Sequence, residues 1–144
     1  MRSKILSVVA AVALGLTITV GAATASSATA NTPCVTAKTF NYGTPSVVTL
    51  PTTSAGSTDC YLVQGNSGNG VKALQRGLVY CENISVGAYG VDGSFGASTK
   101  SAVKLLQSYN GLVQDGQYGN KTRNAMYFLG GASNPAPGSW YTCN

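Results

Sequence analysis

The chain has 144 residues, and its nine basic and four acidic residues give a formal net charge of +5 with no histidine. The charge is modest and forms no basic run, so the sequence gives no indication of nucleic-acid binding. The lack of histidine removes the commonest general base of hydrolases and the mixed cysteine–histidine type of zinc site.

Residues 1–30 have the three parts of a cleavable export signal. A short basic start is followed by an uncharged apolar stretch at residues 5–20 and then by small residues with two Ala-x-Ala sites. These sites predict cleavage after Ala25 or Ala30, and the second is preferred because it leaves a polar residue at the new terminus. An uncleaved membrane anchor is the alternative, but a spanning helix needs about 20 apolar residues and this run is shorter. We therefore expect an exported protein that is free of the membrane.

The exported part begins with an arm, residues 31–60, that is rich in threonine, serine, proline and glycine. Only residues 47–50 have a strand-like composition, and Pro51 interrupts them. We expect this arm to be irregular, either as a linker or laid over the domain.

The first helical pattern follows a glycine-rich turn at residues 65–70. Val71, Leu74, Leu78 and Val79 recur at the spacing that places side chains on one face of a helix. The spacing predicts a helix over residues 69–80.

Two more helices are predicted further along the chain. Ala102, Val103, Leu106 and Tyr109 give one apolar face to a helix over residues 97–109, which Asn110 and Gly111 end in the manner of a left-handed cap. A shorter helix over residues 120–129 would bury Ala125, Met126 and Leu129. Three short helices joined by glycine-rich turns predict a small all-α domain.

The chain ends in a loop-like tail, residues 131–144, that carries Trp140, Tyr141 and a cysteine and is expected to be pinned to the domain. All four cysteines lie in the exported part, where an even number predicts two disulfides. They are Cys34, Cys60, Cys81 and Cys143. A zinc site is disfavoured because no two cysteines have close C-x-x-C spacing and histidine is absent, so no metal or other cofactor is expected.

An internal repeat at a spacing of 23 residues is the most informative feature. Residues 92–99, Asp-Gly-Ser-Phe-Gly-x-x-Thr, recur as residues 115–122, Asp-Gly-Gln-Tyr-Gly-x-x-Thr. In each copy Asp-Gly predicts a turn with positive φ at the glycine. The aromatic residue is expected to fill the core as a hydrophobic plug, and the next glycine is expected to start a helix. The threonine hydroxyl can then bond to unsatisfied groups near that start.

A longer pattern runs from the glycine-rich turn to the second copy of this repeat. It consists of Gly65-x-Ser67-Gly68-x-Gly70-Val71-x-x-Leu74-Gln75, both copies, and Leu106-Gln107 before the second copy. The pattern, over residues 61–130, resembles the peptidoglycan-binding-like domain family. The resemblance implies a three-helix, non-catalytic module of secreted bacterial proteins, found with cell-wall hydrolases, that holds its carrier on peptidoglycan in the wall or outside the cell.

The cysteines allow more than one pairing. If residues 60–64 run back alongside the first helix, Cys60 comes near Cys81, and Cys34 is left to join Cys143. This is the preferred pairing. The alternative joins Cys34 to Cys60 and Cys81 to Cys143.

Binding is favoured over catalysis. A glycan hydrolase would need two suitably spaced carboxylates, and the sequence offers only Asp59, Glu82, Asp92 and Asp115, two of them assigned to turns. We therefore expect a monomeric, non-enzymatic protein that binds peptidoglycan. The alternatives are a module that binds and modulates a cell-wall hydrolase and, less favoured, a small glycan hydrolase.

A groove for a glycan or its stem peptide would use amide side chains, a cation and a flat aromatic ring. The candidate ligand-binding residues are Gln75, Arg76, Tyr89 and Tyr118. For Gln75 and Tyr118, roles in turn capping and core packing are the favoured interpretation.

Overall fold

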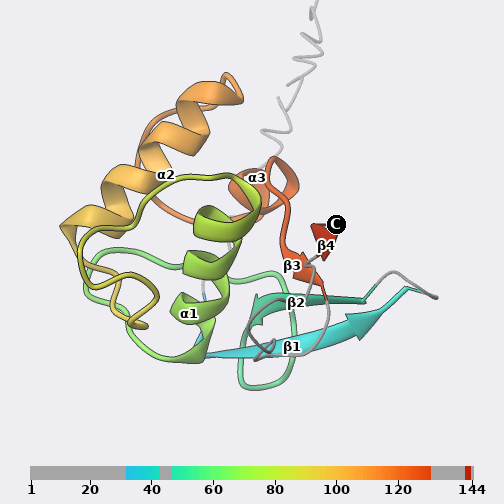
Figure 1. The fold of residues 1–144 in the computed structure, drawn as a ribbon. Helices are drawn as coiled ribbons and strands as arrows, with labels where there is room; N and C mark the ends of the chain where they lie inside the picture. The colour runs from blue at the N-terminus through green and yellow to red at the C-terminus, as the bar shows by residue number, and fades with distance from the viewer. Residues whose placement is uncertain (1–31, 43–46, 131–141, 144) are drawn as a thin grey trace, which may run out of the picture.

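The computed structural model describes residues 32–42, 47–130 and 142–143. The elements in chain order are β1 (Thr36–Asn41), β2 (Val47–Thr52), α1 (Asn69–Arg76), η1 (Gly77–Cys81), α2 (Ala97–Tyr109), α3 (Asn120–Asn124), β3 (Leu129–Gly130) and β4 (Thr142–Cys143) (Figure 1). The export signal and most of the tail lie outside the described residues. Within the described ranges, no helix combines the length and apolar character that crossing a membrane requires.

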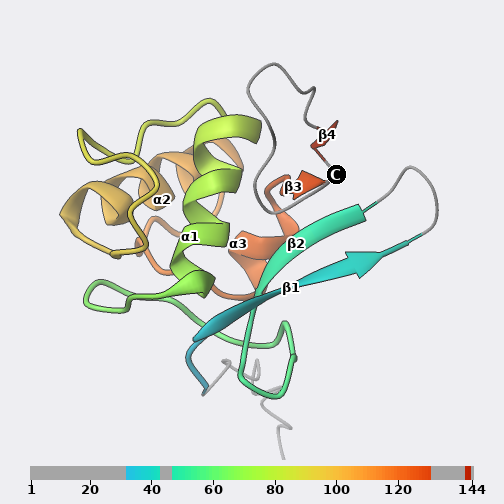
Figure 2. The same ribbon diagram turned by 60° about the horizontal axis from the view of Figure 1, so that its bottom comes forward.

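The N-terminal arm contains a β hairpin, which corrects the expectation of an irregular arm. β1 and β2 pair antiparallel, with Thr36 opposite Thr52 and Asn41 opposite Val47. The hairpin lies beside α1, as both ribbon views show (Figures 1 and 2). Pro51 is tolerated inside β2 because this strand has a partner on one side only, so one edge needs no backbone donor. The all-α expectation is thus corrected: the domain is mainly helical, with a two-stranded hairpin at its start.

The first predicted helix is present as two parts. α1 covers residues 69–76 and continues as the π-helical turn η1 to Cys81. Val71, Leu74 and Leu78 are buried, as the periodicity predicts. The start of the helix packs closely against the arm. A Cβ added to Gly70 would lie only 2.3 Å from the backbone oxygen of Cys34, so this position has room for glycine alone.

α2 spans the predicted range and ends in the predicted cap. Gly111 has a φ of +64°, and the N–H of Leu112 donates to the carbonyl of Gln107 at 2.8 Å. Tyr109 departs from the prediction, because it lies at the edge of the apolar face and is 71% exposed.

α3 is shorter than predicted and stops at Asn124. Met126 and Leu129 are buried, but Leu129 lies in strand β3, where it pairs with Cys143 of β4. The Cys81–Cys143 disulfide holds Cys143 at the end of η1. Strand β4 is thereby placed beside residues 129–130, which pair with it in an extended conformation.

The disulfides join Cys34 to Cys60 and Cys81 to Cys143, so the preferred pairing was wrong and the alternative is present. The reason lies in the backbone at the start of the arm. The N–H of Cys34 donates to the carbonyl of Tyr61 at 2.9 Å, which sets Cys34 beside Cys60. The chain after Cys60 does not follow α1 but pairs at Leu62 with the second repeat copy.

Candidate functional site

The first repeat turn is held from inside by Gln75 of α1. Its Oε1 accepts the backbone N–H of Gly93 at 2.8 Å, and its Nε2 donates to Asp92 Oδ1 at 2.8 Å and to Thr99 Oγ1 at 3.1 Å. The side chain is buried. One amide therefore connects α1, the Asp-Gly turn and the first turn of α2.

The second turn repeats this arrangement around Gln107 of α2. Its Oε1 accepts the N–H of Gly116 at 2.9 Å, and its Nε2 donates to Asp115 Oδ1 at 2.7 Å and to Thr122 Oγ1 at 3.1 Å. The internal repeat of the sequence is thus also a repeat of hydrogen bonding, with a glutamine of one helix fixing the start of the next.

Each Asp-Gly turn has the predicted local geometry. Gly93 and Gly116 have φ values of +82° and +71°, a region in which only glycine is unstrained. Hydrogen bonds from Gln75 and from the backbone N–H of Ser94 hold the pKa of Asp92 below its usual range. Asp92 is therefore an ionised turn residue at neutral pH.

The aromatic residues of the two repeat copies are core plugs, as expected. Phe95 and Tyr118 are buried, and the ring of Tyr118 meets Phe128 edge-on at 6.2 Å between centroids. Burial raises the pKa of the Tyr118 phenol, whose hydroxyl has no hydrogen-bond partner among the described residues.

The structure separates the four candidate ligand-binding residues. Gln75 and Tyr118 lie inside the domain, where each has a structural role. Arg76 is half-buried at the end of α1. Tyr89 is 90% exposed in the loop between η1 and α2. Of the four, Tyr89 offers the most open surface.

All four carboxylates of the chain take part in structural hydrogen bonds. Asp92 and Asp115 belong to the repeat turns, Asp59 accepts from Asn120 Nδ2 at 2.5 Å, and Glu82 accepts from the backbone N–H of Tyr127 at 2.6 Å. In the part of the chain that the structure describes, no group of three or more potential ligands could hold a metal ion.

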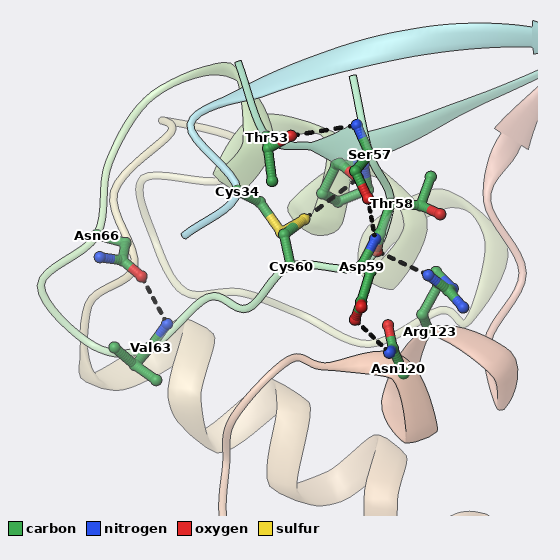
Figure 3. The surroundings of a disulfide bond; sticks show 11 residues. Cys34, Thr53, Ser57, Thr58, Asp59, Cys60, Val63, Asn66, Asn120 and Arg123 are labelled. Carbon is green, nitrogen blue, oxygen red and sulfur yellow. Dashed lines mark hydrogen bonds between the residues drawn. A yellow bond between two sulfur atoms is a disulfide. The ribbon is translucent and has the colours of Figure 1, made fainter. Parts of the chain in front are cut away.

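Sequence reasoning missed how the arm is fastened to α3. Arg123 Nη1 donates to the carbonyl of Thr58 at 2.7 Å, next to the contact between Asp59 and Asn120 (Figure 3). The buried Cys34–Cys60 disulfide lies to one side of this contact in Figure 3. No local pattern signals these contacts, because their partners are more than sixty residues apart.

Residues 67–126, which contain α1 to α3 and both glutamine-held turns, match the family described as "Putative peptidoglycan binding domain". This match confirms, over that segment, the resemblance that the sequence pattern shows. The peptidoglycan-binding domain and the two disulfides together favour an extracellular or cell-wall location.

Known proteins share this domain. The chain is 43% identical over 77 residues to the N-acetylmuramoyl-L-alanine amidase CwlL of Bacillus licheniformis, covering 54% of this chain and 21% of the amidase. It is 37% identical over 103 residues to the zinc D-Ala-D-Ala carboxypeptidase of Streptomyces albus G, and this match covers 58% of this chain and 37% of the carboxypeptidase. The crystal structure of the SleB N-terminal domain matches 46% of this chain and 86% of its own, with 36% identity and a TM-score of 0.42. The chain thus spans only about a fifth to just over a third of these two enzymes.

Proposed function

We propose that this protein is secreted and binds peptidoglycan, or a closely related cell-wall polymer, without cleaving it. The observation that carries the proposal is the match of residues 67–126 to the peptidoglycan-binding family. The matched relatives are named as wall hydrolases, but the matches cover only a minor part of each enzyme.

The chemistry of the chain supports binding without hydrolysis. The chain has no histidine and only four carboxylates, and each carboxylate is held in a turn or between two segments. A retaining or inverting glycosidase needs two carboxylates facing one substrate bond, with one of them free to change its protonation state. The low pKa of Asp92 is the opposite of what a general acid requires.

Charge supports an anionic polymer as the ligand. The described residues carry seven cations and four anions, and the anions are already engaged in the hydrogen bonds given above. The carboxylates of peptidoglycan stem peptides would therefore meet a surface on which lysine and arginine are the more available charges.

Co-sedimentation with insoluble peptidoglycan tests this proposal. The exported chain, purified with both disulfides intact, should pellet with the polymer in a saturable manner at moderate salt, whereas bovine serum albumin should stay in the supernatant. Sedimentation no greater than that of albumin would contradict binding. Cross-linking in a wall extract that captures one protein and no glycan would favour the protein-interaction alternative instead.

A further inference from the structure

Apolar and aromatic side chains lie in a row on the solvent side of α2. Leu105 and Tyr109 are one helical turn apart and are 42% and 71% exposed. Ser98 lies on the same side, two turns before Leu105. The core-facing side of α2 is formed by other residues, among them Val103 and Leu106. Core packing therefore does not explain why large side chains occupy this row.

The loop that carries Tyr89 packs against the start of this row. This loop makes a tight turn, in which the N–H of Gly90 donates to the carbonyl of Gly87 at 3.1 Å. A Cβ added to Gly87 would lie 2.8 Å from both Cβ and Oγ of Ser98, so this turn lies directly against α2. We call Tyr89, Ser98, Leu105 and Tyr109 the α2 strip.

The shape of the α2 strip suits an extended ligand. Tyr89 lies at one end and Tyr109 at the other, and a helix rises about 16 Å from residue 98 to residue 109. In both ribbon views α2 lies on the side of α1 away from the hairpin (Figures 1 and 2).

The charge on the neighbouring flank of α2 suits an acidic ligand. α2 carries Lys100 and Lys104 and no acidic residue. A Cβ added to Gly116 would lie 2.7 Å from Lys100 Cγ and 3.1 Å from Lys104 Cγ, so the second repeat turn supports both lysine stems. Lys104 lies about a quarter of a turn around α2 from Leu105, on the flank that faces the second repeat turn, and Lys100 lies further from the strip. A long lysine side chain on this flank can reach an acidic group of a ligand that lies along the strip.

We propose that the α2 strip, with Lys104 on the adjoining flank of the helix, is the surface through which this module binds peptidoglycan. The rings of Tyr89 and Tyr109 stack on the apolar faces of two sugar residues, Leu105 fills the space between them, and Lys104 pairs with a carboxylate of a stem peptide. This inference rests on the proposed function and adds the binding residues to it.

The test compares Tyr89→Ala, Tyr109→Ala and the double variant with a matched control. The control is Tyr127→Ala, which removes a tyrosine that is 61% exposed and lies between α3 and β3. All four variants should keep the melting temperature of the parent within a few degrees, because each removes a largely exposed ring. The double variant should lose about tenfold or more in affinity for insoluble peptidoglycan, and the control should change less than twofold.

Other results would overturn the assignment. If the parent binds and the double variant binds equally well, or if Tyr127→Ala weakens binding as much, the strip is not the site although the proposed function stands. If the parent itself does not bind, the proposed function fails first. If the parent dimerises and the double variant is monomeric with unchanged wall binding, the strip is a self-association surface.

A spectroscopic measurement keeps the test independent of folding. Amide NMR shifts of the unmodified chain, titrated with soluble fragments of digested peptidoglycan, should move at residues 86–90 and 98–109. Shifts confined to the hairpin or to α3 would overturn the proposal. Lys104→Gln should weaken binding at low salt and make it less dependent on salt.

Discussion

Replacing Gln75 by leucine removes one amide that joins three segments, while the size of the side chain is nearly kept. The main loss is at Gly93, a buried residue whose N–H has Gln75 Oε1 as its acceptor at 2.8 Å. A buried donor left without a partner costs about 1–3 kcal/mol. The lost hydrogen bonds from Gln75 Nε2 to the carbonyl of Ser94 and to Thr99 Oγ1 add less to the loss of stability. The reason is that Thr99 Oγ1 still donates to the carbonyl of Ser94 at 3.3 Å. We expect a total loss of about 2–4 kcal/mol in the free energy of unfolding.

Urea unfolding of the disulfide-bonded chain, followed by circular dichroism, measures this loss directly. Gln117→Leu is the matched control, because Gln117 is an exposed glutamine in the second repeat turn, and it should change stability by less than about 0.5 kcal/mol. Gln75→Glu should be more destabilising than leucine at neutral pH, because it sets a second carboxylate against Asp92. A loss below about 0.5 kcal/mol for Gln75→Leu would refute the view that this amide organises the turn.

Three further predictions concern the turns and the disulfides. Gly93→Ala should lower the free energy of unfolding by about 1–2 kcal/mol, because φ is +82° and the new Cβ would lie 2.9 Å from the Lys72 side chain. Gly96→Ala, at φ −85° with nothing within 4 Å, should be nearly neutral, and equal effects in urea unfolding would contradict this reasoning. The pKa of Asp92 is lower in the folded chain than in the unfolded chain. The ionised carboxylate therefore contributes its full stabilisation of the fold above the unfolded pKa, and this stabilisation is lost as pH falls through the folded pKa. Asp92→Asn should therefore flatten the acid limb of a stability–pH curve, and an unchanged limb would exclude this role. A mild thiol should reduce Cys81–Cys143 before Cys34–Cys60, because Cys143 is exposed and both cysteines of the other bond are buried; alkylation and peptide mapping that found Cys34 and Cys60 modified first would contradict this order.

The parts of the fold that depend on nearby residues follow from the sequence. The bounds of α2, its glycine cap and the two Asp-Gly turns are fixed by residues within a few positions of one another. The burial of Phe95 and Tyr118 follows from the same motifs. The sequence also placed Gln75 correctly in a turn-capping role, because its recurrence as Gln107 ahead of a second Asp-Gly turn indicates shared structure.

The parts that depend on distant partners could not be predicted in this way. The hairpin needs β1 to pair with β2 across Pro51, and the composition of the arm does not show that pairing. The disulfide pairing depends on the contact between Cys34 and Tyr61, which brings the beginning of the arm to its end. Residues 129–130 form strand β3 and not the end of a helix, because β4 provides a strand partner from the far end of the chain.

The binding surface was the least predictable feature. Periodicity places Tyr109 with the core residues of α2. It lies at the edge of that apolar face, however, and its side chain is largely exposed. Tyr89 was recognised as a candidate, but its position beside Ser98 depends on the close approach of Gly87 to α2. A surface that combines a loop and a helix in this way is visible only in three dimensions.

One incubation tests binding without cleavage most directly. The purified exported chain is mixed with insoluble peptidoglycan, the polymer is pelleted, and both the bound protein and the soluble reducing ends and free amino groups are measured over time. We predict saturable binding of the protein with no release of either product above a protein-free control. Release of soluble fragments that grows with time and protein concentration, or no bound protein at saturation, would contradict the proposed function.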